Sequence, residues 1–270
     1  MGLPLFTSST ALITAVLGLL IALFLYLRSR GGGSSAAAGA AGSSQSRSAV
    51  ARAAKGAVLL CGPPGGGKTV LFHRLAFGRG VDTVPSAFQS AVFTALAGAP
   101  AGSAPLKLMD YPGAPQLRAS LLRSARECSG VVVLVDAAGA AAHVQQAADV
   151  LFDLLTDPAV VRGAPRFLVA ASRADAPGAR ALPQLRALLE TELERLRGTR
   201  GAIMQAGEGA LREAGGAEDQ PLLLGRVGER FSFEVDAPLR VEWGEVGGLA
   251  AGSDVNVGAV RTFVAEAAAS

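Results

Sequence analysis

Apolar residues fall into two different patterns along this chain of 270 residues. The first is a long apolar stretch at the N-terminus, where residues 2–27 carry no charged side chain. The second is a series of short apolar runs that alternate with stretches of helical periodicity. Between them lies a segment dominated by Gly, Ser and Ala. The pattern predicts three parts: a transmembrane anchor (1–30), a linker (31–54) and one folded domain (55–270).

The short apolar runs predict a mostly parallel sheet covered by helices, an α/β fold. Because most runs are continuously apolar, we expect strands buried on both faces. Predicted strands are 57–62, 91–96, 105–109, 130–135, 166–171 and 239–243, and predicted helices are 68–77, 115–127, 141–156, 180–197 and 256–268. Leucines at three- and four-residue spacing mark the fourth helix most clearly. Residues 199–230 show weak patterning and predict a loop insertion.

The N-terminal stretch is close to the length of about 20 residues that spans a bilayer. Arg28 and Arg30 follow it directly, so the positive-inside rule places the folded domain in the cytosol. A cleaved signal peptide would begin with basic residues, and a core helix would need a packing domain beside it. Met1-Gly2 fits N-myristoylation, but Phe6 stands where that motif requires Ser or Thr. We expect a single-pass anchor followed by a flexible tether.

Charge and cysteine content exclude other classes of protein. The net charge is +3, and basic residues are scattered except beside the anchor, so no direct binding of nucleic acid is expected. Cys61 and Cys128 are the two cysteines, too few for a disulfide framework or a metal cluster.

The strongest chemical signal is GPPGGGKT, which follows a predicted strand and precedes a predicted helix. Its glycines let backbone N–H groups surround phosphate oxygens, and the helix N-terminus adds positive charge. Lys68 should reach the β- and γ-phosphates, and the Thr69 hydroxyl should hold Mg²⁺. The motif predicts binding of a nucleoside triphosphate through Gly62, Pro63, Pro64, Gly65, Gly66, Gly67, Lys68, Thr69 and Val70.

Two further motifs follow predicted strands. Asp110 begins Asp-Tyr-Pro-Gly, so its carboxylate can hold Mg²⁺ while the Gly113 N–H contacts the γ-phosphate. Asp136, at the end of another strand, is a rival Mg²⁺ ligand. In Ser172-Arg173-Ala174-Asp175, the last carboxylate can accept hydrogen bonds from guanine, and the Arg173 stem can lie across the base.

These motifs, in this order, resemble the phosphate loop, Asp-x-x-Gly and Asn-Lys-x-Asp of the small GTPases. The anchor and the segments SAVF, DYPGAPQLR, FLVAASRAD and APLRVEW more narrowly resemble the β subunit of the signal recognition particle (SRP) receptor. That resemblance implies a P-loop GTPase domain that binds GTP and Mg²⁺ at the endoplasmic reticulum membrane. It implies the N-terminal domain of the receptor α subunit as the partner of the GTP form. It leaves the ribosome and the translocon open as further partners.

The chain departs from the family pattern at several positions. Ser172 and Arg173 replace Asn and Lys, so guanine selectivity would depend mainly on Asp175. Ala114 replaces a water-orienting residue, so we expect slow hydrolysis and assign no catalytic residue.

Two details of the nucleotide site stay open at this point. Gly248, in a Gly-Gly-Leu segment, occupies the loop that would touch the base edge. The family's first switch segment, which should offer Mg²⁺ a Thr or Ser, falls around residues 83–86. The sequence offers both Ser86 and Thr83 as that ligand.

Two other functions remain as alternatives. An Arf/Sar-like GTPase of vesicle trafficking would have the same motifs, although such proteins generally have an amphipathic or acylated N-terminus. A membrane-tethered ATPase would require Asp175 to be incidental.

Overall fold

The computed structural model of the chain describes residues 56–84, 88–100, 103–212, 221–226, 228–248 and 256–269. The predicted anchor (1–30), the linker (31–54) and Ser86 lie outside these residues, as does part of the predicted insertion. Across the described ranges, every helix is too short or too polar to cross a membrane.

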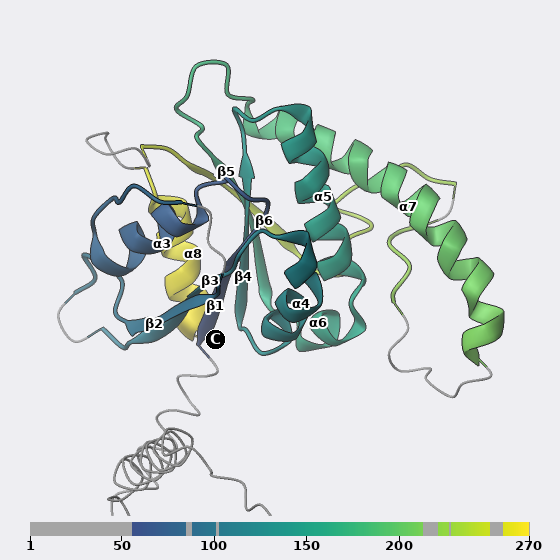
Figure 1. Cartoon of the computed structure of the whole chain (residues 1–270), viewed down its shortest axis with the longest axis horizontal. Coiled ribbons are helices and arrows are strands. Elements are labelled where there is room, and N and C mark those ends of the chain that lie inside the picture. Colours follow the sequence, from purple (N-terminus) through teal and green to yellow (C-terminus); the bar gives the residue numbers. More distant parts are fainter. Residues whose placement is uncertain are drawn as a thin grey trace, which may run out of the picture. The chain divides into compact units, whose positions relative to one another are not determined.

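A six-stranded sheet with strand order β2-β3-β1-β4-β5-β6 forms the centre of the folded domain (Figure 1). The strands are β1 (Ala57–Cys61), β2 (Ser90–Thr94), β3 (Leu106–Asp110), β4 (Gly130–Asp136), β5 (Arg166–Ser172) and β6 (Val241–Val246). All neighbouring strands are parallel except β2, which pairs antiparallel with β3. The predicted α/β fold with a mostly parallel sheet is therefore confirmed.

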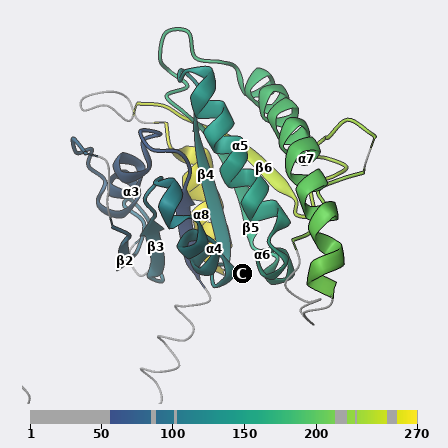
Figure 2. The same ribbon diagram turned by 45° about the vertical axis from the view of Figure 1, so that its right-hand side comes forward.

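Helices cover both faces of the sheet, as Figures 1 and 2 show from two directions. One face carries α3 (Lys68–Phe77) and α8 (Gly258–Ala269), and the other carries η1 (Pro115–Leu117), α4 (Arg118–Arg126), α5 (Ala141–Thr156), α6 (Pro158–Gly163) and α7 (Leu182–Arg212). Residues of β1 and β4 alternate between the two hydrophobic clusters that result. Both strands are buried along their whole length, which explains their continuous apolar sequences.

The edge strand β2 does not fit the expectation of burial on both faces. Only β3 pairs with it, and its residues are exposed or half-buried. Phe93, in the middle of this strand, is 57% exposed. An apolar residue on an edge strand leaves the same sequence pattern as one in a central strand, so the pattern alone did not separate them.

The predicted boundaries of two elements are wrong. Helix α7 continues to Arg212, past the end expected at residue 197, so the first part of the predicted loop insertion is helical. Good helix formers such as Ala, Glu, Met and Leu in this segment support the continuation. Strand β6 ends at Val246 rather than at residue 243, which brings its last residue beside Ser172 of β5.

Described residues between 226 and 231 lie against α7. Arg197 is 7% exposed and donates hydrogen bonds to the backbone oxygens of Arg226 and Glu229. The backbone N–H of Phe231 donates to the Glu194 carboxylate at 2.8 Å. A nearly buried guanidinium therefore holds this segment in place, because its donors would otherwise be unsatisfied.

Candidate nucleotide-binding site

The phosphate loop (residues 62–69) connects the end of β1 to the start of α3. Strand β1 lies between β3 and β4, so the loop is at the carboxyl edge of the sheet, where open α/β sheets bind ligands. Gly62, Gly65 and Gly67 have φ values of 132°, 75° and 84°, which favour glycine. A Cβ atom at Gly62 would lie only 2.4 Å from the Leu134 carbonyl oxygen. The glycines of the motif therefore set the shape of the loop.

Lys68, the first residue of α3, lies back across the phosphate loop. It is 7% exposed, and its Nζ donates a hydrogen bond to the Pro63 carbonyl oxygen at 2.6 Å. Burial lowers the pKa of this ammonium, while the charge of Asp110 acts in the opposite direction. The side chain thus places a donor group inside the loop, where phosphate oxygens can replace the carbonyl as its partner.

Thr69 and Asp110 form the second part of the site. Asp110 ends β3 directly beside β1, and its Oδ2 accepts a hydrogen bond from the Thr69 hydroxyl at 2.6 Å. Burial raises the pKa of this carboxyl group, opposed by the hydrogen bond from Thr69 and the charge of Lys68. Its Oδ1 is buried and has no hydrogen-bond partner among the described residues.

These two side chains fit a magnesium ion. Mg²⁺ takes oxygen ligands, and proteins usually bind it through one or two carboxylates together with substrate phosphates. A hydroxyl beside a buried carboxylate with one unsatisfied oxygen supplies that donor set. Among the described residues, no group of three His, Cys, Asp or Glu side chains offers an alternative metal site.

A cavity of about 480 Å³ opens beside the phosphate loop. Its walls come from three segments of the chain, namely the phosphate loop with Val70, the first switch and the turn after Asp110. The lining residues are Pro64, Gly65, Gly67, Lys68, Thr69, Val70, Thr83, Val84, Pro112, Gly113, Ala114 and Pro115. The structure therefore brings most of the residues predicted to contact the phosphates together. Of the two candidate Mg²⁺ ligands from the first switch, Thr83 lines this cavity, and Ser86 lies outside the described residues.

The switch turn, residues 112–117, packs directly on the phosphate loop. A Cβ atom at Gly113 would lie 2.4 Å from the backbone nitrogen of Pro64 and 2.7 Å from the Gly62 carbonyl oxygen. Only glycine allows this approach. The Gly113 backbone is thus held beside the cavity, and the methyl group of Ala114 lines the cavity wall next to it.

Residues predicted to contact the base lie at the ends of β5 and β6. Arg173 has a φ value of 54°, and its Nε donates to Asp136 Oδ1 at 2.9 Å, within a two-point ion pair. Asp175 is exposed, and a Cβ atom at Gly247 would lie 3.1 Å from its Oδ1. Gly248 follows with a φ value of 64°. These groups form a second cluster, separate from the lining of the cavity beside the phosphate loop.

Ser172, also predicted to contact the base, is the last residue of β5. It is fully buried, and its hydroxyl donates to the Val135 carbonyl oxygen at 3.4 Å. The side chain therefore points between β4 and β5.

Sequence reasoning missed the ion pair between Asp136 and Arg173. Asp136 also accepts a hydrogen bond from the Ala138 N–H at 3.1 Å, so its carboxylate has both a backbone and a side-chain partner. Asp136 and Ser172 are paired residues at the ends of adjacent strands. The available signal was an acidic residue at the end of one strand and a basic residue directly after another, namely Asp136 of β4 and Arg173 after β5. The geometry thus places Asp110, and not Asp136, beside Thr69.

Comparisons with known proteins agree with this architecture. The family model described as signal recognition particle receptor beta subunit matches residues 53–237. The human signal recognition particle receptor subunit beta is 32% identical over 205 residues, which cover 76% of this chain and 72% of that protein.

Solved structures of the same receptor are also similar. The mammalian SRP receptor structure aligns with a TM-score of 0.60 and 28% identity, covering 78% of this chain and 99% of that one. The Chaetomium thermophilum SRP receptor β subunit with GDP and Mg aligns with a TM-score of 0.54 and 25% identity, covering 78% and 96%. From the family match and the identity to the human relative, this chain belongs to the family of SRP receptor β subunits.

Proposed function

We propose that this chain binds GTP with Mg²⁺ and acts as the membrane-anchored β subunit of an SRP receptor. In this role it holds the α subunit at the endoplasmic reticulum membrane for cotranslational targeting. The observation that carries the proposal is the hydrogen bond between Thr69 and Asp110, beside a carboxylate oxygen that has no other described partner. The family match favours a receptor subunit over an Arf/Sar-like trafficking GTPase.

Each group of the site has a separate role in the proposed complex. Lys68 and the loop N–H groups bind the phosphates, since the loop and the N-terminus of α3 both favour anions. Thr69 and Asp110 hold Mg²⁺, which neutralises charge on the β- and γ-phosphates when it is bound. Thr83 or Ser86 completes the metal site from the first switch. The Gly113 N–H senses the γ-phosphate.

Guanine recognition depends on the exposed carboxylate of Asp175, which can accept two hydrogen bonds from the base. The ion pair with Asp136 orients Arg173, so its stem is available to pack on the base while its charge is neutralised. Gly247 leaves room for Asp175, and Gly248 lies next along the chain. Ser172 supports this site from within the sheet instead of binding the base.

Hydrolysis by the isolated chain should be slow. Ala114 lines the cavity with a methyl group, which cannot orient an attacking water molecule. The chain would then remain in the triphosphate state long enough to hold its partner.

The α subunit should bind beside the first switch. Val84 and Phe88 are 82% and 84% exposed, and Phe93 of the edge strand β2 is 57% exposed. Exposed apolar side chains of this size are typical of interaction surfaces. Val84 also lines the nucleotide cavity, so a partner at this surface would be sensitive to the bound nucleotide.

Membrane attachment is assigned to the N-terminal segment. Residues 1–30 would cross the bilayer, and the linker 31–54 would allow the domain to reach its partners. Protease treatment of sealed microsomes should digest the folded domain, because Arg28 and Arg30 favour a cytosolic orientation. Protection of the domain inside the vesicles would contradict this topology.

Nucleotide titrations of the full-length protein test the binding proposal. Lys68→Ala should abolish or greatly weaken GTP binding, because the phosphates lose their cation. Lys107→Ala is a matched control, since that ammonium lies over the Phe93 ring and not in the cavity. Asp175→Asn should reduce the preference for GTP over ATP. Equal affinity of the unmodified protein for ATP and GTP would contradict the guanine assignment.

A further inference from the structure

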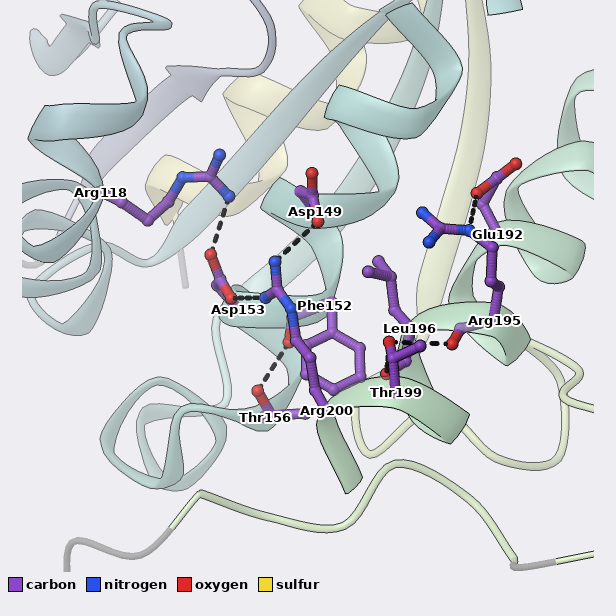
Figure 3. A network of polar contacts seen from close by, with 10 residues as sticks. All are labelled: Arg118, Asp149, Phe152, Asp153, Thr156, Glu192, Arg195, Leu196, Thr199 and Arg200. Carbon is purple, nitrogen blue, oxygen red and sulfur yellow. Dashed lines mark hydrogen bonds and ion pairs between the residues drawn. The ribbon is translucent and has the colours of Figure 1, made fainter. Parts of the chain in front are cut away.

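Four charged side chains, Arg118, Asp149, Asp153 and Arg200, form a cluster that joins α4, α5 and α7 (Figure 3). We call it the Asp153 cluster, because Asp153 of α5 is shared between two arginines. Asp153 Oδ2 accepts from Arg118 at 2.8 Å, and its Oδ1 accepts from Arg200 at 2.6 Å. Arg200 also donates to Asp149 at 2.7 Å. One carboxylate thus connects the first residue of α4 to the middle of α7.

The geometry of the cluster is well defined. The side chains of Arg118 and Asp153 are each 22% exposed, so their ion pair is screened less than one on the open surface. The Arg200 guanidinium lies 5.2 Å from the centre of the Phe152 ring, which adds a cation–π contact. Burial raises the pKa of Asp153, and the charges of both arginines oppose that change. The two arginines thus oppose the effect of burial on this carboxyl group.

At one end, the cluster begins where the switch turn ends. Arg118 directly follows the 3-10 helix Pro115–Leu117, and Gly113 at the other end of the turn packs on the phosphate loop. A second cavity, of about 410 Å³, separates the turn from the cluster. It is lined by Gly113 and Pro115 from the turn and by Arg118, Asp153 and Arg200 from the cluster. A movement of Gly113 would therefore have space to proceed, and Arg118 is joined to this glycine through only four residues of chain.

At the other end, the cluster contacts α7 one turn beyond the last buried leucine whose side chain is described. Leu185, Leu189, Leu193 and Leu196 are buried against the core, and Leu196 is the last of them. Arg200 lies one turn further and contacts α5 through Asp149 and Asp153. The helix then continues to Arg212. An isolated helix of about 12 residues is marginal in water, so a contact that fixes the start of this segment should add to its stability.

We propose that Asp153 acts as a positioning residue that couples the switch turn to the C-terminal third of α7, residues 201–212. The stability of this helical segment then changes with the bound nucleotide. Helix α7 thereby offers a second nucleotide-dependent surface, on the face of the sheet opposite to α3 and α8. This inference rests on the proposed GTP switch. It adds a route by which that switch reaches beyond the exposed apolar surface near β2.

Hydrogen–deuterium exchange of the full-length protein in detergent tests the coupling. Amide exchange over residues 201–212 would be compared with GDP·Mg²⁺ and with a non-hydrolysable GTP analogue bound. We expect the rates in the two states to differ by about two- to fivefold, the range of one or two partly exposed ion pairs. Equal rates in both states, in protein shown by titration to bind both nucleotides, would overturn the coupling. Protein that bound neither nucleotide would instead refute the proposed function.

Three variants show whether the coupling passes through the cluster. Asp153→Asn should abolish the difference between the two states over residues 201–212. Arg118→Gln should do the same although it leaves both contacts of Arg200 intact, because it cuts only the switch side. Arg200→Gln, at a half-exposed position, serves if Asp153→Asn fails to fold. A difference that persisted in Arg118→Gln and in a second folded variant would overturn the proposal.

Glu192→Gln is the matched control. Glu192 accepts from Arg195 on the same helix at 2.8 Å and from Gln145 of α5 at 3.5 Å (Figure 3 draws the first). No hydrogen bond or ion pair among the described residues joins it to the Asp153 cluster. Removing this ion pair should leave the nucleotide-dependent difference over residues 201–212 unchanged. Loss of the difference in this variant would mean that α7 responds to any lost charge, and would contradict a specific role for Asp153.

Discussion

Two carboxylates end the strands on either side of β1, Asp110 in β3 and Asp136 in β4, and each has a different partner. Asp110 accepts a hydrogen bond from Thr69, whereas Asp136 pairs with Arg173. Both are buried and both follow a strand, so sequence position alone does not distinguish them. Their partners do, because Thr69 belongs to the phosphate loop and Arg173 to the segment after β5 that is proposed to bind the base.

This difference predicts that replacing each Asp by Asn affects a different property of the site. Asp110→Asn should lower affinity for Mg²⁺·GTP by about 10- to 100-fold, because the ion loses its charged partner. Asp136→Asn should leave the magnesium dependence intact and alter guanine selectivity through Arg173. Titrations with fluorescent GTP, with Mg²⁺ and with EDTA, would measure both. A larger loss of magnesium dependence in Asp136→Asn would reverse the assignment.

Gly113 is the residue whose size matters most at the switch turn. Its hypothetical Cβ lies 2.4 Å from the Pro64 nitrogen, so Gly113→Ala must displace the turn from the phosphate loop. We expect a lower melting temperature and a reduced ratio of GTP to GDP affinity.

Gly198→Ala provides the matched control for that substitution. A Cβ atom there meets nothing within 4 Å and lies inside α7, so it should stabilise the fold by about 0.5–1 kcal/mol. If both variants behaved alike in thermal unfolding and in titration, close packing at Gly113 would not be the cause.

At the residue scale, the residues predicted for the phosphate side of the site lie together around one cavity. Fixed spacing places Lys68 and Thr69 on one turn of a helix, and a local motif needs no knowledge of the fold. The pairs between Asp136 and Arg173 and between Asp153 and Arg200 could not be predicted that way. Their members lie 37 and 47 positions apart in sequence, and meet only because of the strand order and the helix packing.

At the scale of elements, the short helix α6 shows which signals the sequence contained. Asp157 caps this helix by accepting hydrogen bonds from the N–H groups of Ala159 and Val160, and Pro158 occupies its first turn. An Asp-Pro start is a readable capping signal. The helix is only six residues long, so apolar periodicity could not reveal it. Apolar periodicity also failed to reveal the extension of α7, because the Gly and Ala residues there form no clear apolar stripe.

The cap makes a prediction about stability and pH. Burial tends to raise the pKa of Asp157, but hydrogen bonds from Arg126, Val160 and Ala159 outweigh burial and lower the pKa overall. The charged form therefore stabilises the folded state above the unfolded pKa of about 3.9, and this contribution is lost as the pH falls through the lower folded pKa. Asp157→Ala should cost about 1 kcal/mol at neutral pH and less in acid.

Asp157→Asn separates the contribution of the capping oxygen from that of the negative charge. Asparagine keeps a capping oxygen but has no charge, so its loss should be smaller and nearly independent of pH. Urea unfolding across a pH series would measure the three proteins together. A cost for Asp157→Ala that did not decline in acid would show that the charge of Asp157 has no part in it.

At the scale of the whole molecule, one turn of chain separates two cavities. The nucleotide cavity and the second cavity share Pro64, Gly113 and Pro115 in their walls. Around this turn, the exposed apolar surface near β2 lies on one side and the Asp153 cluster on the other. A ligand that fixes the turn would therefore affect both surfaces, provided that it binds the two arrangements with different affinity.

The most direct test of the account is the affinity of the SRP receptor α-subunit N-terminal domain for this full-length chain, loaded either with a non-hydrolysable GTP analogue or with GDP. Lys68→Ala serves as the control that takes neither nucleotide. The account predicts tighter binding to the GTP form, by a factor between about 5 and 150, which is the usual range of coupling between sites. Equal affinity for the two loaded forms would contradict it, and would leave the chain as a tether that does not respond to nucleotide.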